Sequence, residues 1–171
     1  MNGDPMKQLA TIFMITMALT ISGCASSVSE TAKVEYLTYV STGQAVPVKH
    51  FTDSHGNSID LTESHNAKLL ILFATWCPDS QRAMKALQAS DLILDPNLDI
   101  IGIGREENKE VLDKFANEYQ INFPLVADSD RSIYAKFANA GIPRLILLDG
   151  ENHIVKAIIA EGDNPLAEVR W

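Results

Sequence analysis

The side chain best suited to covalent chemistry in this sequence is Cys77, which follows an apolar run over Leu69–Phe73 and directly precedes Pro78. The run predicts a buried strand, and proline is favoured at the first position of a helix, so we expect the thiol at a helix N-terminus. Free backbone N–H groups and the helix dipole place partial positive charge there, which favours the nucleophilic thiolate. We therefore expect Cys77 to be an exposed, reactive thiol. Ser80 stands three residues later, where a dithiol site would carry its second sulfur.

Length and charge limit the classes of function. The chain has 171 residues and a formal net charge of −8, which suits one domain with a sizeable core and argues against nucleic-acid binding. The four histidines show no metal-ligand spacing; they are His50, His55, His65 and His153. We expect no metal and no organic cofactor, and we expect a monomer.

The N-terminus is expected to be a targeting segment. Residues 9–21 form an uncharged apolar run, shorter than the ~20 residues that span a bilayer but typical of a signal-peptide core. The sequence Ile21-Ser22-Gly23-Cys24 resembles a bacterial lipobox, in which the cysteine is lipidated and becomes the mature N-terminus. An ordinary secretory signal with an incidental cysteine is the alternative. We thus expect a lipoprotein signal peptide over 1–23, lipidated Cys24 and a tether over 24–42, and the folded domain over 43–171.

These boundaries imply a location and a constraint on redox chemistry. A lipid on Cys24 would anchor the protein to a membrane of the cell envelope, with its domain on the periplasmic or other extracytoplasmic side. Disulfides persist in that compartment. However, Cys77 would then be the only thiol of the mature protein, so no disulfide could form within the chain.

The rest of the sequence predicts alternating strands and helices, with a strand pair at the start and a hairpin at the end. Strands are expected over 46–51, 59–61, 69–73, 98–103, 123–127, 144–148 and 154–159, with a tight turn over 53–57. Helices are expected from Pro78, after an Asn108 cap and over 130–138, with one or two further helical turns in 162–171. This order predicts an α/β domain with a central mixed β-sheet, helices on both faces and an N-terminal β-hairpin extension.

The order of elements and two motifs resemble the thioredoxin fold, and most closely the TlpA-type membrane-tethered thiol–disulfide oxidoreductases. The first motif is Ala74-Thr75-Trp76-Cys77-Pro78 after an apolar strand, and the second is Gly141-Ile142-Pro143 before another strand. The resemblance covers about residues 43–161. It implies that Pro143 is cis and packs against the reactive cysteine, and that Ile142 offers its backbone to an extended substrate.

The resemblance also implies a substrate-binding surface around Cys77, consisting of Trp76, Pro78, Ile142, Pro143 and Arg144. Trp76 is expected to cover the thiol and shape this surface, with core packing as the alternative. Arg144 could point toward Cys77 and favour its thiolate, or it could be an exposed surface arginine. Ser80 cannot release a mixed disulfide as a second thiol would, but its hydroxyl could donate a hydrogen bond to the Cys77 sulfur.

Two functions remain open at this stage. The first is a monothiol thiol–disulfide oxidoreductase or isomerase, in which Cys77 forms mixed disulfides with protein or low-molecular-weight thiols. The second is a non-catalytic thioredoxin-fold module that binds a partner at the same surface. Ser80 could also be an engineered replacement for a cysteine. A peroxidatic site is not expected, because Thr75 lies two residues before the cysteine rather than three.

Overall fold

A computed structural model describes residues 35–171. The expected signal peptide, the lipidation at Cys24 and the first part of the tether lie outside these residues. No helix in the described part of the chain is long and apolar enough to cross a membrane.

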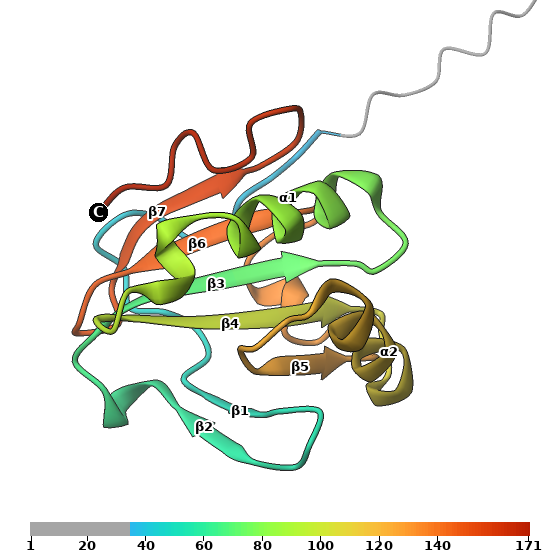
Figure 1. Cartoon of the computed structure of the whole chain (residues 1–171). Coiled ribbons are helices and arrows are strands. Elements are labelled where there is room, and N and C mark those ends of the chain that lie inside the picture. The colour runs from blue at the N-terminus through green and yellow to red at the C-terminus, as the bar shows by residue number, and fades with distance from the viewer. Residues whose placement is uncertain (1–34) are drawn as a thin grey trace, which may run out of the picture. The chain divides into compact units, whose positions relative to one another are not determined.

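A five-stranded mixed sheet forms the centre of the domain (Figure 1). Its strands are β3 (Ala67–Phe73), β4 (Leu98–Arg105), β5 (Leu125–Asp128), β6 (Arg144–Leu148) and β7 (Ile154–Ile159), in the order β5-β4-β3-β6-β7. The first three run parallel, whereas β6 is antiparallel to β3 and β7 is antiparallel to β6. The predicted central mixed sheet is therefore confirmed, and β3, which leads to Cys77, is its middle strand.

Strand β3 is buried on both faces, as its unbroken apolar sequence predicts. Because successive side chains of a strand point to opposite faces, Leu70 and Leu72 enter one half of the core, while Leu69 and Ile71 enter the other. The strand is thereby fixed between two cores, and its C-terminal end, which precedes the thiol, has little freedom to shift.

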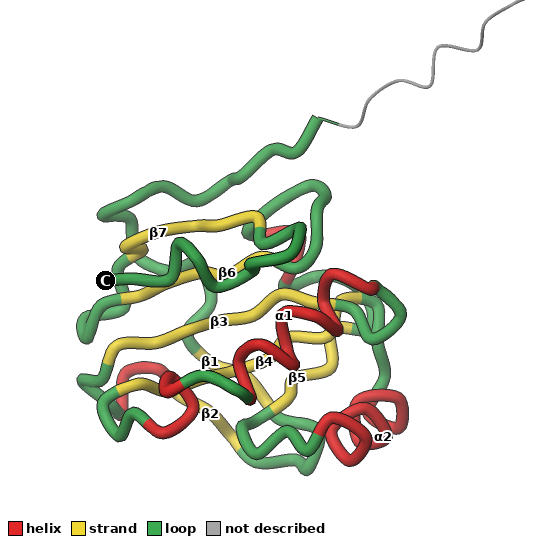
Figure 2. Tube along the Cα trace, turned by 45° about the horizontal axis from the view of Figure 1, so that its top comes forward, coloured by secondary structure: helices red, strands yellow, loops and turns green. Residues whose placement is uncertain are grey.

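The two α-helices of residues 35–171 cover the same face of the sheet (Figures 1 and 2). They are α1 (Pro78–Gln88) and α2 (Lys109–Tyr119). Met84 and Leu87 from α1, with Leu112 and Phe115 from α2, share one core cluster with Leu69. A short 3-10 helix, η2 (Asp91–Leu94), follows α1.

The opposite face is covered without an α-helix in the described residues. Its cover consists of β1 (His50–Thr52), β2 (Ser58–Asp60), the 3-10 helices η1 (Leu61–Glu63) and η3 (Tyr134–Lys136), and the chain before β1. The short helix expected over 130–138 is confirmed only as the 3-10 helix η3. Arg131 has a φ of 63°, which interrupts helical geometry, and the Asp128 carboxylate accepts the N–H groups of Ile133 and Tyr134. Residues 162–171 also form turns instead of a helix.

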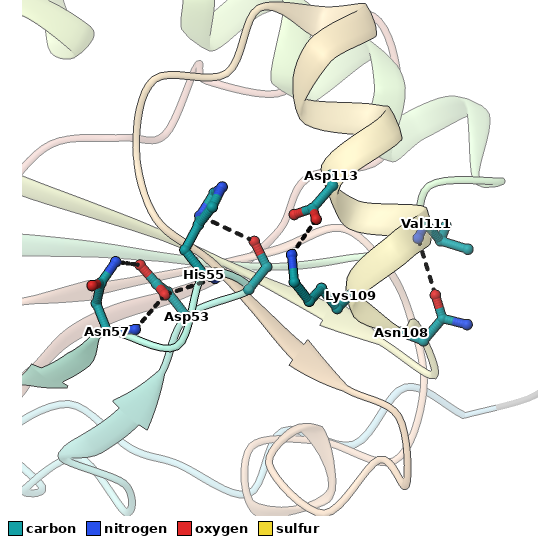
Figure 3. Close-up of polar contacts among 8 residues, drawn as sticks. Asp53, His55, Asn57, Asn108, Lys109, Val111 and Asp113 are labelled. Atoms are coloured by element: carbon teal, nitrogen blue, oxygen red, sulfur yellow. Dashed lines mark hydrogen bonds and ion pairs between the residues drawn. The ribbon is translucent and has the colours of Figure 1, made fainter.

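Two polar features predicted from the sequence are confirmed close to one another in space (Figure 3). The Asp53 carboxylate accepts backbone N–H groups from His55 and Asn57, at 2.9 and 2.8 Å, and closes the turn between β1 and β2. The Asn108 side chain accepts the N–H of Val111 at 3.0 Å and caps α2. The hairpin extension and the start of α2 are therefore set by local side-chain hydrogen bonds.

The folded domain begins before residue 43, the expected boundary. Thr38 forms an isolated bridge with Ala138, and the Tyr39 N–H donates to the Phe137 carbonyl at 2.8 Å. The last part of the expected tether, residues 35–42, is thus paired with the domain. The Thr38 hydroxyl of this segment accepts a hydrogen bond from a side chain that lies more than 100 residues further along the chain.

That side chain is Arg144, which is only 1% exposed. Its Nε donates to the carbonyls of Ala140 and Gly141 at 3.0 and 3.2 Å, and one terminal nitrogen donates to the Thr38 hydroxyl at 2.7 Å. The other donates to the carbonyls of Leu37 and Ala140. Arg144 therefore joins the N-terminal segment to the loop before β6.

We predict that Arg144→Met lowers the free energy of unfolding by about 2–3 kcal/mol, because it leaves several carbonyls without their donor. Urea unfolding measures this loss. Arg82→Met is the matched control, since Arg82 makes a partly exposed ion pair with Asp79 and should cost about 1 kcal/mol or less. Equal losses in the two variants would contradict this role for Arg144.

Candidate active site

Cys77 is the N-cap residue of α1, with Pro78 at the first helical position, as predicted. Its backbone is extended, with φ −83° and ψ 121°, and its N–H donates to the Ala74 carbonyl at 3.2 Å. The thiol is less exposed than expected, because residue 77 is only 7% accessible. Its Sγ donates to the Ile142 carbonyl at 3.6 Å, so the sulfur lies against the loop before β6.

The Ile142–Pro143 peptide bond is cis, as the resemblance implied. Pro143 is buried, and its carbonyl accepts the N–H of Ala160 at 3.0 Å. The Ile142 N–H has no hydrogen-bond partner among residues 35–171, while its carbonyl faces the thiol. The two polar backbone groups of Ile142 are therefore not used by the sheet, which is the condition for pairing with another chain.

Trp76 is 65% exposed, which excludes the alternative that it packs in the core. Pro78 is also exposed. The structure thus brings Cys77, Ile142 and Pro143 together and leaves Trp76 and Pro78 at the surface beside them. That these residues bind a substrate stays a prediction.

Arg144 does not belong to this surface. Both expectations for it, an approach to Cys77 and an exposed position, are wrong, because its donors bind the oxygens of residues 37–38 and 140–141. As the first residue of β6 it pairs with Leu72 and Ile159, deep in the sheet. Its hydrogen bonds to the carbonyls of residues 140 and 141 stabilise the loop that carries Ile142.

Ser80 is fully buried, and its hydroxyl oxygen accepts the backbone N–H of Ala74 at 3.3 Å. The expected hydrogen bond from Ser80 to the Cys77 sulfur is not found among the described residues. Ser80 therefore connects the first turn of α1 back to the end of β3. In this structure its role is to fasten the segment that carries the thiol.

A buried carboxylate that the sequence did not reveal also holds the segment before Cys77. Glu107 lies in the loop between β4 and α2, yet it is buried. Its Oε1 accepts both the N–H of Thr75 at 2.8 Å and the Thr75 hydroxyl at 2.7 Å. Gln81 donates to the Thr75 carbonyl at 2.7 Å. Side chains from two elements therefore hold the residue that lies two positions before Cys77.

A third contact fixes the first turn of α1 to the C-terminal part of the chain. Asp79 pairs with Arg82 and accepts the N–H of Gly162 at 3.3 Å, and Arg82 donates to the Gly162 carbonyl at 2.9 Å. The hydrogen bond from Arg82, followed by that from Gly162, lowers the pKa of Asp79. The loop after β7 is thereby held to the first turn of α1, the helix that Cys77 caps.

No group of side chains in residues 35–171 has the composition of a metal site. A surface cavity of about 440 Å³ lies between α1 and α2, lined by Lys85, Gln88 and Tyr119 among others, but no residue of the thiol site lines it. A smaller one of about 240 Å³ includes Thr75 and Gln81 in its wall and so reaches the back of the thiol segment. Neither of these two cavities has Cys77 in its wall.

Comparison with known proteins agrees with this fold. The sequence profile of the AhpC/TSA family matches residues 42–157. The thiol-disulfide oxidoreductase ResA of Bacillus anthracis is 22% identical over 158 residues, which is 91% of each chain. The protein of the same name from Bacillus subtilis is 23% identical over 121 residues, covering 70% of this chain and 68% of that one.

Solved structures show the same architecture. A putative protein disulfide isomerase from Bacteroides thetaiotaomicron superposes with a TM-score of 0.67 and 28% identity, covering 74% of this chain and 83% of that one. The thioredoxin domain of a thiol-disulfide oxidoreductase from Bacteroides vulgatus gives a TM-score of 0.60 and 23% identity, over 72% and 91%. The predicted thioredoxin-like fold is confirmed.

We predict that Glu107→Ala lowers the free energy of unfolding by about 1–3 kcal/mol, because the Thr75 N–H and hydroxyl lose their acceptor. Glu107→Gln keeps an amide oxygen at that place and should lose less than half as much. Urea unfolding measures both, with Glu110→Ala as the control for an exposed glutamate nearby. If Glu107→Ala is no less stable than Glu110→Ala, the proposed fastening is wrong.

Proposed function

The chain belongs to the AhpC/TSA family, and we propose that it carries out thiol–disulfide exchange through Cys77. The observation that carries this proposal is the position of the sulfur. Cys77 caps the N-terminus of α1, and its Sγ lies 3.6 Å from the Ile142 carbonyl beside the cis Pro143. A thiol at a helix N-terminus, next to backbone that can bind an extended chain, has both the nucleophile and the docking edge that exchange with a protein disulfide requires.

The first exchange step needs only the Cys77 thiol and a substrate disulfide. The Cys77 thiolate attacks one sulfur of the substrate, a bond forms between the two sulfurs, and the substrate's own S–S bond breaks. The second substrate sulfur leaves as a thiolate and takes a proton from solvent. A first external thiol attacks the Cys77 sulfur of the mixed disulfide and releases the substrate sulfur bound to it as a thiolate. A second external thiol attacks the disulfide so formed and restores Cys77, so the two external thiols end as a disulfide and supply the two electrons that reduce the substrate.

Ser80 makes the reaction a monothiol one. It stands where a second sulfur would be, and its hydroxyl accepts the N–H of Ala74. A hydroxyl does not displace a thiolate at neutral pH, so the mixed disulfide persists until a thiol arrives from outside. This separates the chain from dithiol members of the TlpA type, which the sequence otherwise resembles.

A peroxidatic role gains no support from the site. The Thr75 hydroxyl donates to Glu107, on the α2 side of the loop, while the Cys77 sulfur faces Ile142. The Arg144 guanidinium is bound to oxygens of the N-terminal segment and of the loop before β6. Neither the Thr75 hydroxyl nor the Arg144 guanidinium is therefore placed to donate a hydrogen bond to an oxidant at the Cys77 sulfur.

The same protein is proposed to be a lipid-anchored envelope protein. The support is in the sequence: an uncharged run over residues 9–21 that ends in Ile21-Ser22-Gly23-Cys24. Cleavage before Cys24 and lipidation of its thiol would leave Cys77 as the only free thiol. The domain would then meet disulfide-bonded proteins in an oxidising compartment.

A non-catalytic binding module is the alternative. It is favoured by the missing second sulfur and by the low exposure of Cys77, which is 7%. In that case the surface around Trp76 and Ile142 would hold a partner without a covalent step. The two functions differ in whether Cys77 becomes linked to a partner.

We predict that Ser80→Cys, which restores two cysteines three residues apart at the start of α1, gains insulin reductase activity with dithiothreitol as donor. The wild-type chain should instead accumulate mixed disulfides that are seen on non-reducing gels and reversed by reductant, because nothing inside it resolves them.

Ser80→Ala is the matched control for the loss of the hydrogen bond to Ala74, and it should gain no reductase activity. Cys77→Ser should abolish the mixed disulfides. A Ser80→Cys protein that forms its internal disulfide yet stays inactive, beside a wild-type protein that traps no partner, would favour the binding module.

We predict that Cys24→Ser moves the protein from the membrane to the soluble fraction of the cell envelope. Acyl chains supply the anchoring, at ~0.8 kcal/mol per buried CH₂, and serine cannot carry them. Fractionation and intact mass measure the outcome, with Ser22→Ala as a control that leaves Cys24 in place. A wild-type protein that keeps residues 1–23 would overturn the lipoprotein proposal.

A further inference from the structure

The chain between the expected anchor and the domain lies directly against the loop that carries Ile142. Leu37 donates its N–H to the Asn139 side chain at 2.8 Å, and the Asn139 side chain donates to the Glu35 carbonyl at 2.8 Å. Arg144 binds the same segment from the other side through Thr38 and Leu37. Residues 35–39, here called the N-terminal strap, are therefore held to the loop by side chains of both the loop and β6.

Tyr36 of the strap packs on Gly141, the residue before Ile142. A Cβ at position 141 would lie 3.1 Å from the Tyr36 ring, and the three atoms nearest to it all belong to that ring. Gly141 also has a φ of +86°, which disfavours a side chain there. The Tyr36 ring thus lies in tight contact with the position that a Cβ of residue 141 would take. Tyr36 remains 44% exposed, so part of the ring faces solvent.

The hydroxyl end of Tyr36 lies toward the loop after β7. Glu161 is close enough to raise the pKa of Tyr36, first through its negative charge and then together with partial burial of the phenol. The next residue, Gly162, is bound by Asp79 and Arg82 in the first turn of α1. Tyr36 therefore lies next to two loops, one that carries Gly141 and Ile142 and one that carries Glu161 and Gly162. Both loops contact the start of α1, the first at Cys77 and the second through Gly162.

An extended peptide that pairs with Ile142 must pass over this ring. Paired residues of neighbouring strands lie about 5 Å apart, so a peptide bound to the Ile142 backbone has its next residue beside Gly141. Gly141 has no side chain to meet it, and the Tyr36 ring lies directly beside this position. A small disulfide reaches only the sulfur and need not extend so far.

We propose that Tyr36 is a specificity-determining residue, whose exposed ring contacts the main chain and side chains of an extended polypeptide substrate next to its reacting cysteine. The proposal rests on the proposed exchange through Cys77. It assigns Tyr36, and not the whole strap, to the substrate-binding surface, although its sequence position suggested only a tether. Aromatic side chains suit this task because they supply a large contact area and lose little conformational entropy.

The test compares two disulfides that share one leaving group. The first is a short extended peptide whose single cysteine is joined to thionitrobenzoate, and the second is dithiobis(nitrobenzoate). Attack of the Cys77 thiolate forms a disulfide with the peptide or with one nitrobenzoate and releases coloured thionitrobenzoate in both cases. The full chain is used, and the rate of Cys77→Ser is subtracted to remove any reaction elsewhere.

Tyr36→Ala should lower the rate constant for the peptide about five- to tenfold and leave that for the small reagent within about twofold. Tyr36→Phe keeps the ring and should behave as the wild type. Tyr39→Ala is the matched control, because Tyr39 is an exposed tyrosine of the same strap. Urea unfolding of each variant shows whether the strap remains bound.

A Tyr36→Ala protein with an unchanged ratio of the two rate constants overturns the proposal, whether both fall or neither does. An equal change of that ratio in Tyr39→Ala also overturns it. If the wild-type chain releases no more thionitrobenzoate than Cys77→Ser from either reagent, the proposed exchange itself fails, and the role of Tyr36 falls with it.

Discussion

Arg144 directs its donors to carbonyl and hydroxyl oxygens and has no carboxylate partner among its hydrogen bonds. A buried charge is costly unless hydrogen bonds replace its water shell. Here the required oxygens come from two segments, residues 37–38 and residues 140–141. Neither segment can move away without leaving the guanidinium unsatisfied, so the strap, the loop before β6 and the sheet form one unit. The position of Ile142 beside the Cys77 sulfur depends on this unit.

The segment before the thiol is held by the same requirement, that buried polar groups have hydrogen-bond partners, which here concerns backbone groups. Between the end of β3 and the start of α1, the chain leaves the sheet, and its N–H and C=O groups need new partners. The Ser80 hydroxyl accepts the N–H of Ala74, and the Glu107 carboxylate accepts that of Thr75. The Gln81 side chain donates to the Thr75 carbonyl. The side chain of Ser80, in the first turn of α1, thus helps to hold this segment in its conformation. Its presence explains how the segment keeps its shape without a second sulfur.

Local sequence signals predicted most of the elements. Strand β3 was predicted from its unbroken apolar run, the helix start from the Asn108 cap, and the turn over 53–57 from its Gly and Asn residues. These features depend on neighbours within a few positions. The short helix expected over 130–138 is reduced to the 3-10 helix η3, because Asp128 binds the N–H groups of Ile133 and Tyr134 and Arg131 adopts a positive φ. The sequence pattern reveals neither of these features.

The site was predicted only where sequence neighbours determine it. Cys77, Pro78 and the cis Pro143 lie within two short motifs, whereas Glu107 and Tyr36 reach the site from distant segments whose partners no local pattern identifies. Arg144 shows the limit most clearly. Its proximity to Pro143 suggested a place beside the thiol, but alternate residues of β6 share a face, and Ile146 and Leu148 lie in the core opposite the helices. That alternation directs Arg144 toward the same face, where the strap supplies the oxygens that let it be buried. The residue next to the docking loop therefore stabilises the loop and leaves the contact with a substrate to residues on its outer side.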